Sequence, residues 1–117
     1  MKKQSFDKSL GYAWQGIIAC IKKERNIKIH LCMMVLVIVC GFIFHLTYFE
    51  WIICIVLFGL VISLEVLNTA IEAVVDLCSP NIHPLAKLAK DAAAGAVLVS
   101  AITAAIIGLM IFIPKIC

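Results

Sequence analysis

The chain has 117 residues, of which 64% are hydrophobic and only 15% are charged, and its formal net charge at pH 7 is +3. Its mean hydropathy is +1.12. A soluble domain of this length could not bury so much apolar surface, because small folds leave a large fraction of their area exposed. The composition therefore excludes an ordinary soluble enzyme and predicts one all-α integral membrane domain.

Residues 5–24 are predicted to form an amphipathic helix. Apolar side chains recur at helical spacing through this stretch, Ser5 is a suitable N-cap, and basic residues lie at both ends. The segment is too polar to span a bilayer. We expect it to lie in the membrane interface, with Tyr12 and Trp14 at the level of the lipid headgroups.

Three apolar segments follow, each long enough to cross a hydrocarbon layer about 30 Å thick. They are predicted to span residues 29–49, 51–75 and 92–113, the last ending at Pro114. Only a few residues near 48–51 join the first two, which predicts a tight antiparallel hairpin. The second connection, residues 77–88, contains two prolines and is predicted to be a longer loop.

The distribution of Lys and Arg predicts the orientation. Of these ten residues, seven precede the first span, Lys87 and Lys90 flank the second connection, and only Lys115 lies at the other end. Cytoplasmic segments carry the excess of positive charge in membrane proteins. We therefore expect a multi-pass protein of the bacterial cytoplasmic membrane with its N-terminus inside and its C-terminus outside.

The third span has a small residue at every fourth position. This pattern lets helix backbones approach closely. Three helices also offer little interior in which to bury polar side chains, so the chain is predicted to form an oligomer, although the spacing does not give the number of copies. The repeated residues are Ala92, Ala96, Ser100, Ala104 and Gly108.

The second span carries a polar stripe in its C-terminal half. Its members follow an i, i+3, i+4, i+7, i+11 spacing, so at 100° per residue they share one helical face. Ionisable groups at such a depth are costly and normally face a protein interior or a water cavity, where they have a function. With lysines close by, the stripe predicts a site for a cation and a phosphate group at the membrane surface. The stripe consists of Glu65, Asn68, Thr69, Glu72 and Asp76, and the lysines are Lys87 and Lys90.

The carboxylates have distinct candidate roles. Glu72, with a second carboxylate such as Glu24, is suited to hold Mg²⁺, which prefers oxygen ligands. Glu65 lies deeper and is a candidate general base for the proton of a lipid hydroxyl. Lys90, next to Asp91, is placed to offset the charge of transferring phosphate oxygens.

The remaining polar residues have two interpretations each. Asn68 and Thr69 could bind phosphate oxygens or orient the carboxylates, but they could equally form hydrogen bonds between helices. His83 could contact a nucleotide or be a solvated loop residue. No role is predicted for His30 or His45.

Two stretches of the chain match a known pattern. The sequence E-V-L-N-T-A-I-E-A-V-V-D at 65–76, followed by A-K-D-A-A-A-G-A-V at 89–97, resembles the signature of the small prokaryotic diacylglycerol kinases. The resemblance covers nearly the whole chain. E-R-N at 24–26, H-P-L-A-K at 83–87 and I-F-I-P-K at 111–115 resemble the Gram-positive branch, whose members are undecaprenol kinases.

The resemblance implies a homotrimer with composite active sites between protomers, in which MgATP phosphorylates a lipid hydroxyl. It implies Glu65 as the general base and Glu24 and Glu72 as the metal-binding carboxylates. Where the best-known enterobacterial members have Arg and Ser, this chain has Ser5 and Ala94. The positions that the resemblance implies around the nucleotide are Tyr12, Glu24, Asn68, Glu72, His83, Lys90 and Asp91.

The leading interpretation is a membrane lipid kinase that uses ATP and Mg²⁺ to phosphorylate undecaprenol, with no nucleic-acid partner. Diacylglycerol is the alternative acceptor, because both lipids present a primary alcohol at the interface. A small oligomeric ion or proton transporter would instead use Glu65 and Glu72 as relays, although the outer halves of the spans offer no polar path. A purely structural subunit would tolerate substitutions in the polar stripe.

Overall fold

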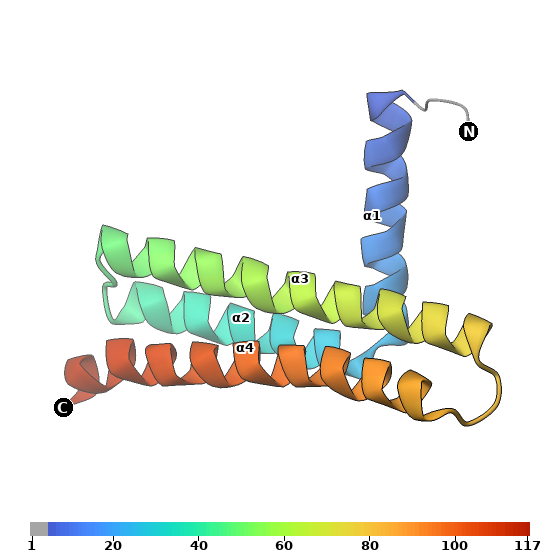
Figure 1. Cartoon of the computed structure of the whole chain (residues 1–117). Helices are drawn as coiled ribbons and strands as arrows, with labels where there is room; N and C mark the ends of the chain where they lie inside the picture. Colours follow the sequence, from blue (N-terminus) through green and yellow to red (C-terminus); the bar gives the residue numbers. More distant parts are fainter. Residues whose placement is uncertain (1–4) are drawn as a thin grey trace.

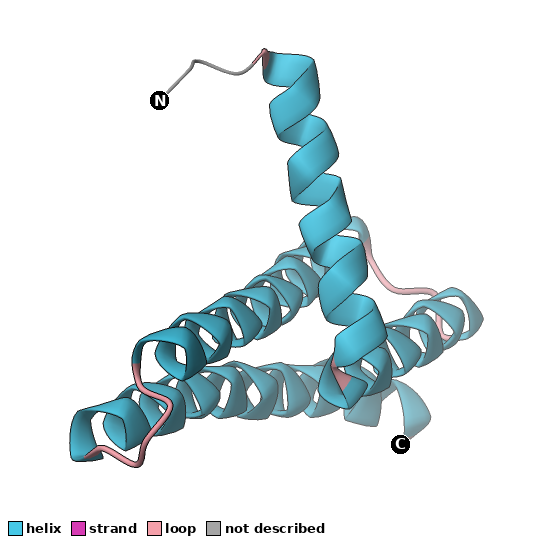
Figure 2. Cartoon of the chain, turned by 90° about the vertical axis from the view of Figure 1, so that its right-hand side faces the viewer, coloured by secondary structure: helices cyan, strands magenta, loops and turns pink. Residues whose placement is uncertain are grey.

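The computed structural model describes residues 5–117, and within that range it is an all-helical protein (Figure 1). The helices are α1 (Phe6–Lys23), α2 (Arg25–Ile43), α3 (Tyr48–Cys78) and α4 (Pro84–Ile116). Helices α2, α3 and α4 run alongside one another and form a three-helix body, from which α1 projects at a steep angle (Figures 1 and 2). The predicted all-α architecture is confirmed.

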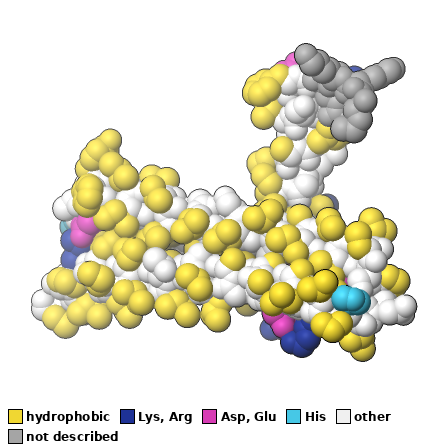
Figure 3. Space-filling view, viewed as in Figure 1, with side chains coloured by type: hydrophobic (Ala, Val, Ile, Leu, Met, Phe, Trp, Pro, Cys, Tyr) yellow, Lys and Arg dark blue, Asp and Glu magenta, His cyan; other side chains and the backbone are white. Residues whose placement is uncertain are grey.

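Helices α2, α3 and α4 are the three described helices that are long and apolar enough to cross a membrane. Apolar side chains cover most of the visible face of the three-helix body, and charged ones gather near its two ends (Figure 3). At a rise of about 1.5 Å per residue, the 31 residues of α3 extend about 46 Å, more than the hydrocarbon thickness of about 30 Å. The charged ends of α3 and α4 can therefore lie outside the apolar layer, as expected for a membrane protein.

Helix α1 begins at the predicted cap. The Ser5 hydroxyl accepts a hydrogen bond from the backbone N–H of Lys8 at 3.4 Å. Asp7 lies in the first turn, and Lys22 and Lys23 lie in the last turn, as the helix dipole favours. None of the residues of α1 is buried, so its apolar side chains are free to meet lipid or another protein surface.

The turn between α2 and α3 lies at residues 44–47, so the predicted position near 48–51 is wrong. His45 has a positive φ of 56°, and the N–H of Leu46 donates to the carbonyl of Gly41 at 3.0 Å, which caps the end of α2. The side chains and backbones of Thr47 and Glu50 then form a capping box that starts α3. An apolar run interrupted only by His45 and Thr47 hid this turn, although T-Y-F-E at 47–50 has the spacing of a capping box.

The second connection is shorter than predicted, because helix occupies most of residues 77–88. Helix α3 continues to Cys78 and α4 begins at Pro84, so the loop contains only residues 79–83. Proline suits the first position of a helix, and Nδ1 of His83 caps that helix by accepting from the N–H of Leu85 at 3.1 Å. Asp91 therefore lies inside α4, whereas the predicted third span began one residue after it.

Helix α4 also continues past Pro114, where the sequence predicted that it would stop. It ends at Ile116, with Pro114 inside its last turns. A proline so close to a C-terminus removes only one backbone donor from the helix.

A small hydrophobic cluster lies at the end of the body where α2 turns into α3. Leu46, Cys54 and Ile111 are buried there, one from the turn, one from α3 and one from α4. We call this region the turn end, and it also includes Gly41, Thr47, Glu50, Trp51 and Lys115. The opposite end, where the polar stripe of α3 meets the loop before α4, is the site end.

Candidate active site

The polar stripe of α3 runs from the interior of the chain to its surface. Glu65, Asn68 and Thr69 are buried, with exposed fractions of 2%, 9% and 7%. Glu72, one turn further along, is half-buried, and Asp76 is exposed. The predicted common face is confirmed for the buried part of the stripe, and burial falls toward the site end.

Glu65 is the most buried charged residue of the stripe, and its closest polar neighbour comes from α2. The Nε2 atom of His30 lies 3.0 Å from Oε1 of Glu65. The ring N–H is not aligned with this oxygen, and within the described residues Oε1 has no hydrogen-bond donor. The sequence assigned no role to His30, although a histidine inside an apolar span is itself a sign of function.

Asn68 and Thr69 form their hydrogen bonds within α3 and not between helices. The amide of Asn68 donates from Nδ2 to Oε1 of Glu72 at 3.2 Å, which orients that carboxylate. The hydroxyl of Thr69 donates to the backbone carbonyl of Glu65 at 3.1 Å. The carbonyl oxygen Oδ1 of Asn68 is buried and has no donor among the described residues. Asn68 therefore keeps one unused acceptor beside two carboxylates.

Glu24 lies between α1 and α2, where the backbone is extended, with φ −101° and ψ 121°. Its charge and that of Glu72 both act on the Glu65 carboxyl, so three acidic side chains share one neighbourhood. Within residues 5–117, however, no set of three or more His, Cys, Asp or Glu side chains is arranged to hold a metal ion. A single chain thus brings the predicted carboxylates near one another without forming a closed metal cage.

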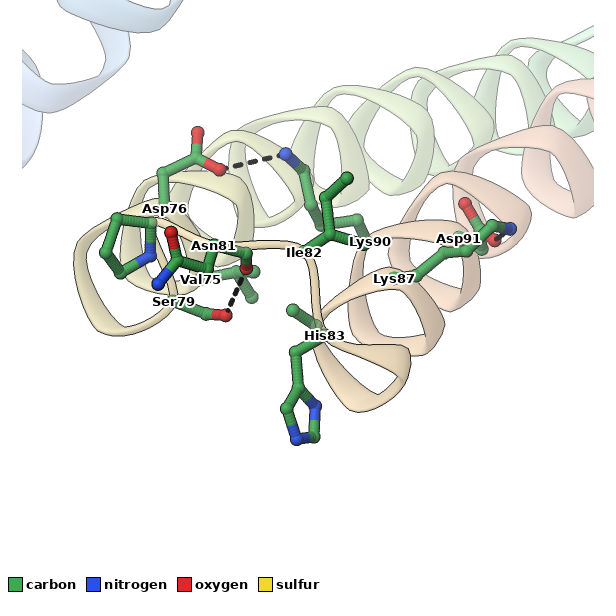
Figure 4. A pocket seen from close by; sticks show the side chains of 11 residues that line it. Val75, Asp76, Ser79, Asn81, Ile82, His83, Lys87, Lys90 and Asp91 are labelled. Atoms are coloured by element: carbon green, nitrogen blue, oxygen red, sulfur yellow. Dashed lines mark hydrogen bonds and ion pairs between the residues drawn. The ribbon is translucent and has the colours of Figure 1, made fainter.

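An open pocket of about 380 Å³ lies beside the loop that joins α3 to α4 (Figure 4). Nζ of Lys90 pairs with Oδ1 of Asp76 at 2.9 Å, and Nζ of Lys87 pairs with Oδ2 of Asp91 at 2.6 Å. The ring of His83 points away from both ion pairs (Figure 4). The two lysines at this open pocket provide donors for anionic groups.

The predicted site residues thus fall into two groups and one outlier. Glu65, Asn68 and Glu72 lie on the stripe of α3, and Glu24 lies on the segment between α1 and α2. His83, Lys90 and Asp91 line the loop pocket. Tyr12 lies on α1, is 55% exposed and is not among the residues that line this pocket.

The fold and this site define a class: a small helical membrane protein with a buried carboxylate and a lysine-bearing pocket at one end. A sequence model described as prokaryotic diacylglycerol kinase matches residues 11–112. The chain belongs to this family, as its two signature stretches indicated, and it is accordingly a lipid kinase.

Three relatives illustrate the similarity. The chain is 51% identical over 110 residues to undecaprenol kinase of Bacillus subtilis, which covers 94% of this chain and 89% of that protein. It is 43% identical over 107 residues to diacylglycerol kinase of Synechocystis, covering 91% of this chain and 61% of that protein. It is 33% identical over 99 residues to diacylglycerol kinase of Escherichia coli K12, and the match covers 85% of this chain and 81% of that protein.

Proposed function

We propose that the protein transfers the γ-phosphate of MgATP to the hydroxyl group of undecaprenol and produces undecaprenyl phosphate and ADP. The similarity to the undecaprenol kinase of Bacillus subtilis, at 51% identity over 94% of this chain, carries the proposal. The buried Glu65, the half-buried Glu72 and the lysine-bearing pocket supply groups suited to this reaction.

Glu65 is the proposed general base. Its carboxylate accepts the hydroxyl proton as the lipid oxygen bonds to the γ-phosphorus and ADP leaves. Lys90, released from its exposed ion pair with Asp76, offsets the negative charge on the phosphate oxygens. Phosphoryl transfer requires positioning and charge stabilisation more than covalent chemistry, and the bilayer holds the acceptor alcohol in one plane.

The donor set fits Mg²⁺. This ion is commonly bound by one or two carboxylates, with substrate phosphates and water completing its shell, so a cage of three protein ligands is not required. Glu24 and Glu72 are the proposed ligands, and the Glu72 carboxylate is already oriented by Asn68. When bound, the ion would neutralise charge on the phosphates of ATP.

The proposed nucleotide site is shared between copies of the chain. Tyr12, Asn68, His83 and Asp91, with Glu24, Glu72 and Lys90, are the proposed contacts, but one chain does not gather all of them around one pocket. Much of the apolar surface of the three-helix body is also exposed. A homotrimer with sites between protomers would cover part of this surface and bring Tyr12 toward a neighbouring stripe.

The chain is proposed to form a single membrane domain. Residues 5–24 would lie in the interface, and helices α2, α3 and α4 would cross the membrane. The excess of Lys and Arg near the site end supports a cytoplasmic N-terminus and an external C-terminus. The site end would then face the compartment that contains ATP.

Diacylglycerol is the second candidate acceptor. The relatives in Synechocystis and Escherichia coli are named diacylglycerol kinases, at 43% and 33% identity. Both acceptors carry a primary alcohol, so the same base and the same phosphate contacts would serve either lipid.

The test is a phosphorylation assay with purified protein, Mg²⁺ and γ-labelled ATP, using undecaprenol and diacylglycerol side by side. We expect kcat/KM for undecaprenol to exceed that for diacylglycerol by about tenfold or more, or about 1.4 kcal/mol in transition-state binding. The Glu72→Gln variant is expected to need a higher Mg²⁺ concentration. A preference for diacylglycerol would move the proposal to the second acceptor, and no lipid phosphorylation at all would refute it.

A further inference from the structure

The candidate base has one side-chain contact that the proposed mechanism does not yet use. His30 lies in the second turn of α2, and its Nε2 atom is 3.0 Å from Oε1 of Glu65. The histidine side chain is 24% exposed, whereas that of Glu65 is only 2% exposed. The contact therefore links a buried carboxylate to a group that partly reaches the surface of the chain.

The other charges around Glu65 are unfavourable to it. Glu24 and Glu72 are like charges that act on the same carboxyl. The hydroxyl of Thr69 donates to the backbone of Glu65 and not to its carboxylate. A carboxylate removed from water needs a partner that can carry positive charge or donate a hydrogen bond. His30 is the described side chain in contact with Glu65 that can do both.

We propose that His30 is a positioning residue for Glu65. Its imidazole contacts Oε1 of Glu65 and serves as the counter-charge of the carboxylate. The second carboxylate oxygen then faces the acceptor hydroxyl. This inference rests on the proposed role of Glu65 as general base. The residue acts through Glu65 and is not proposed to touch the lipid or the nucleotide.

The present geometry suits a contact that tightens during the reaction. The two atoms are at hydrogen-bond distance, but the ring N–H is not aligned with the oxygen. Catalytic hydrogen bonds are often poorly aligned without substrate and improve when substrate is bound.

The experiment compares two variants at the same position. His30→Leu removes the polar contact and leaves a side chain that an apolar helix tolerates, whereas His30→Gln keeps an N–H donor without the charge. The matched control is His45→Asn, because His45 follows the other end of α2 and Asn accepts its positive φ of 56°. For each protein, kcat, both KM values and thermal unfolding in detergent are measured with undecaprenol and MgATP.

We expect His30→Leu to lower kcat by about tenfold to 100-fold, as misplacement of a catalytic group does, with both KM values within about twofold of wild type. His30→Gln should recover several-fold of that loss and remain a few-fold below wild type. His45→Asn should behave as wild type.

Three results would overturn the inference: a wild-type kcat in His30→Leu, an effect confined to KM, or a His30→Gln variant as slow as His30→Leu. If His30→Leu does not fold, the kcat of His30→Gln decides. A folded His30→Gln protein with wild-type kcat would contradict the proposed counter-charge. Wild-type protein that phosphorylates no lipid refutes the proposed function itself, which separates that failure from failure of the role assigned to His30.

Discussion

The two ends of the three-helix body treat their polar groups in opposite ways. At the turn end, the side chains of Thr47 and Glu50 each bond to the other's backbone, and Glu50 also pairs with Lys115 at 3.0 Å. At the site end, Oε1 of Glu65 and Oδ1 of Asn68 are buried and have no hydrogen-bond donor among the described residues.

This difference separates stability from function along the molecule. Buried polar groups without a partner are few in folded proteins, and each calls for an explanation such as a ligand or a catalytic role. At the turn end, the ion pair of Glu50 with Lys115 connects α3 with α4, and the hydrogen bonds of Thr47 and Glu50 fix the turn after α2. The site end retains donors and acceptors for a substrate. Substitutions at the site end should therefore alter activity more than stability, and substitutions at the turn end should do the reverse.

Exchanging a glutamate for glutamine at each end gives the largest expected contrast. Glu65→Gln should lower kcat by about 100-fold or more, because an amide cannot accept the hydroxyl proton. Its thermal unfolding should change little, because glutamine keeps the size of the side chain and the neighbouring His30 is partly exposed to solvent. Glu50→Gln is the matched control and should retain kcat within about twofold, since no step uses it. Both are checked by lipid phosphorylation and thermal unfolding in the same detergent. Full activity in Glu65→Gln would remove it from the proposed mechanism.

A glycine at the turn end should show the reverse pattern. A Cβ at Gly41 would lie 2.5 Å from Cη2 of Trp51 and 3.0 Å from Cδ1 of Leu46. Gly41→Ala should therefore lower the free energy of unfolding by about 1–3 kcal/mol, as overpacking does. Gly59→Ala is the control, because nothing lies within 4 Å of its added Cβ, and it should be neutral or stabilising.

Denaturant unfolding in mixed micelles measures both glycine variants. The kcat of the folded Gly41→Ala protein should stay near that of wild type. Equal stability of the two variants would show that α2 and α3 are not closely packed at the turn end.

The ion pair between Lys90 and Asp76 tests whether a site-end contact is structural or functional. If Lys90 binds phosphate, Lys90→Gln should lower kcat by about tenfold, or about 1.4 kcal/mol, and raise the KM for ATP. Asp76→Asn removes the same exposed ion pair, and should change kcat by no more than about twofold, because exposed pairs contribute little. Steady-state kinetics with varied ATP distinguishes the two. Equal losses in both variants would indicate that the ion pair itself is required.

The polar stripe was predictable because it depends on the geometry of a single helix. Glu65, Asn68 and Thr69 share one face whatever surrounds the helix, and their polarity in an apolar segment predicted burial against protein. The membrane-length helices followed from composition for the same reason. The signature stretches around Glu65 and Lys90 supplied the family, which helical periodicity alone could not have supplied.

The contact between His30 and Glu65 was not predictable in this way, because it depends on the register between two helices. Their register is set by the turn that joins them, and the predicted turn lay about four residues too far along the chain. Because one helix gains the four residues that the other loses, the residue opposite Glu65 changes by about eight positions, or about 12 Å along the axis. The turn itself was hidden because His45 occupies a position where glycine is the usual signal.

The turn at His45 also gives the smallest predicted effect. Its φ of 56° is left-handed, which costs about 1 kcal/mol for a residue with a Cβ. His45→Gly removes that strain but gives the unfolded chain more freedom, so the free energy of unfolding should rise by at most about 1 kcal/mol. His45→Val should lower it, because a branched side chain fits this conformation poorly. Thermal unfolding of both variants checks the order. Since the turn end contains no part of the proposed site, both should keep wild-type kcat, and a kcat that changed with the residue at this turn would contradict the separation between the two ends.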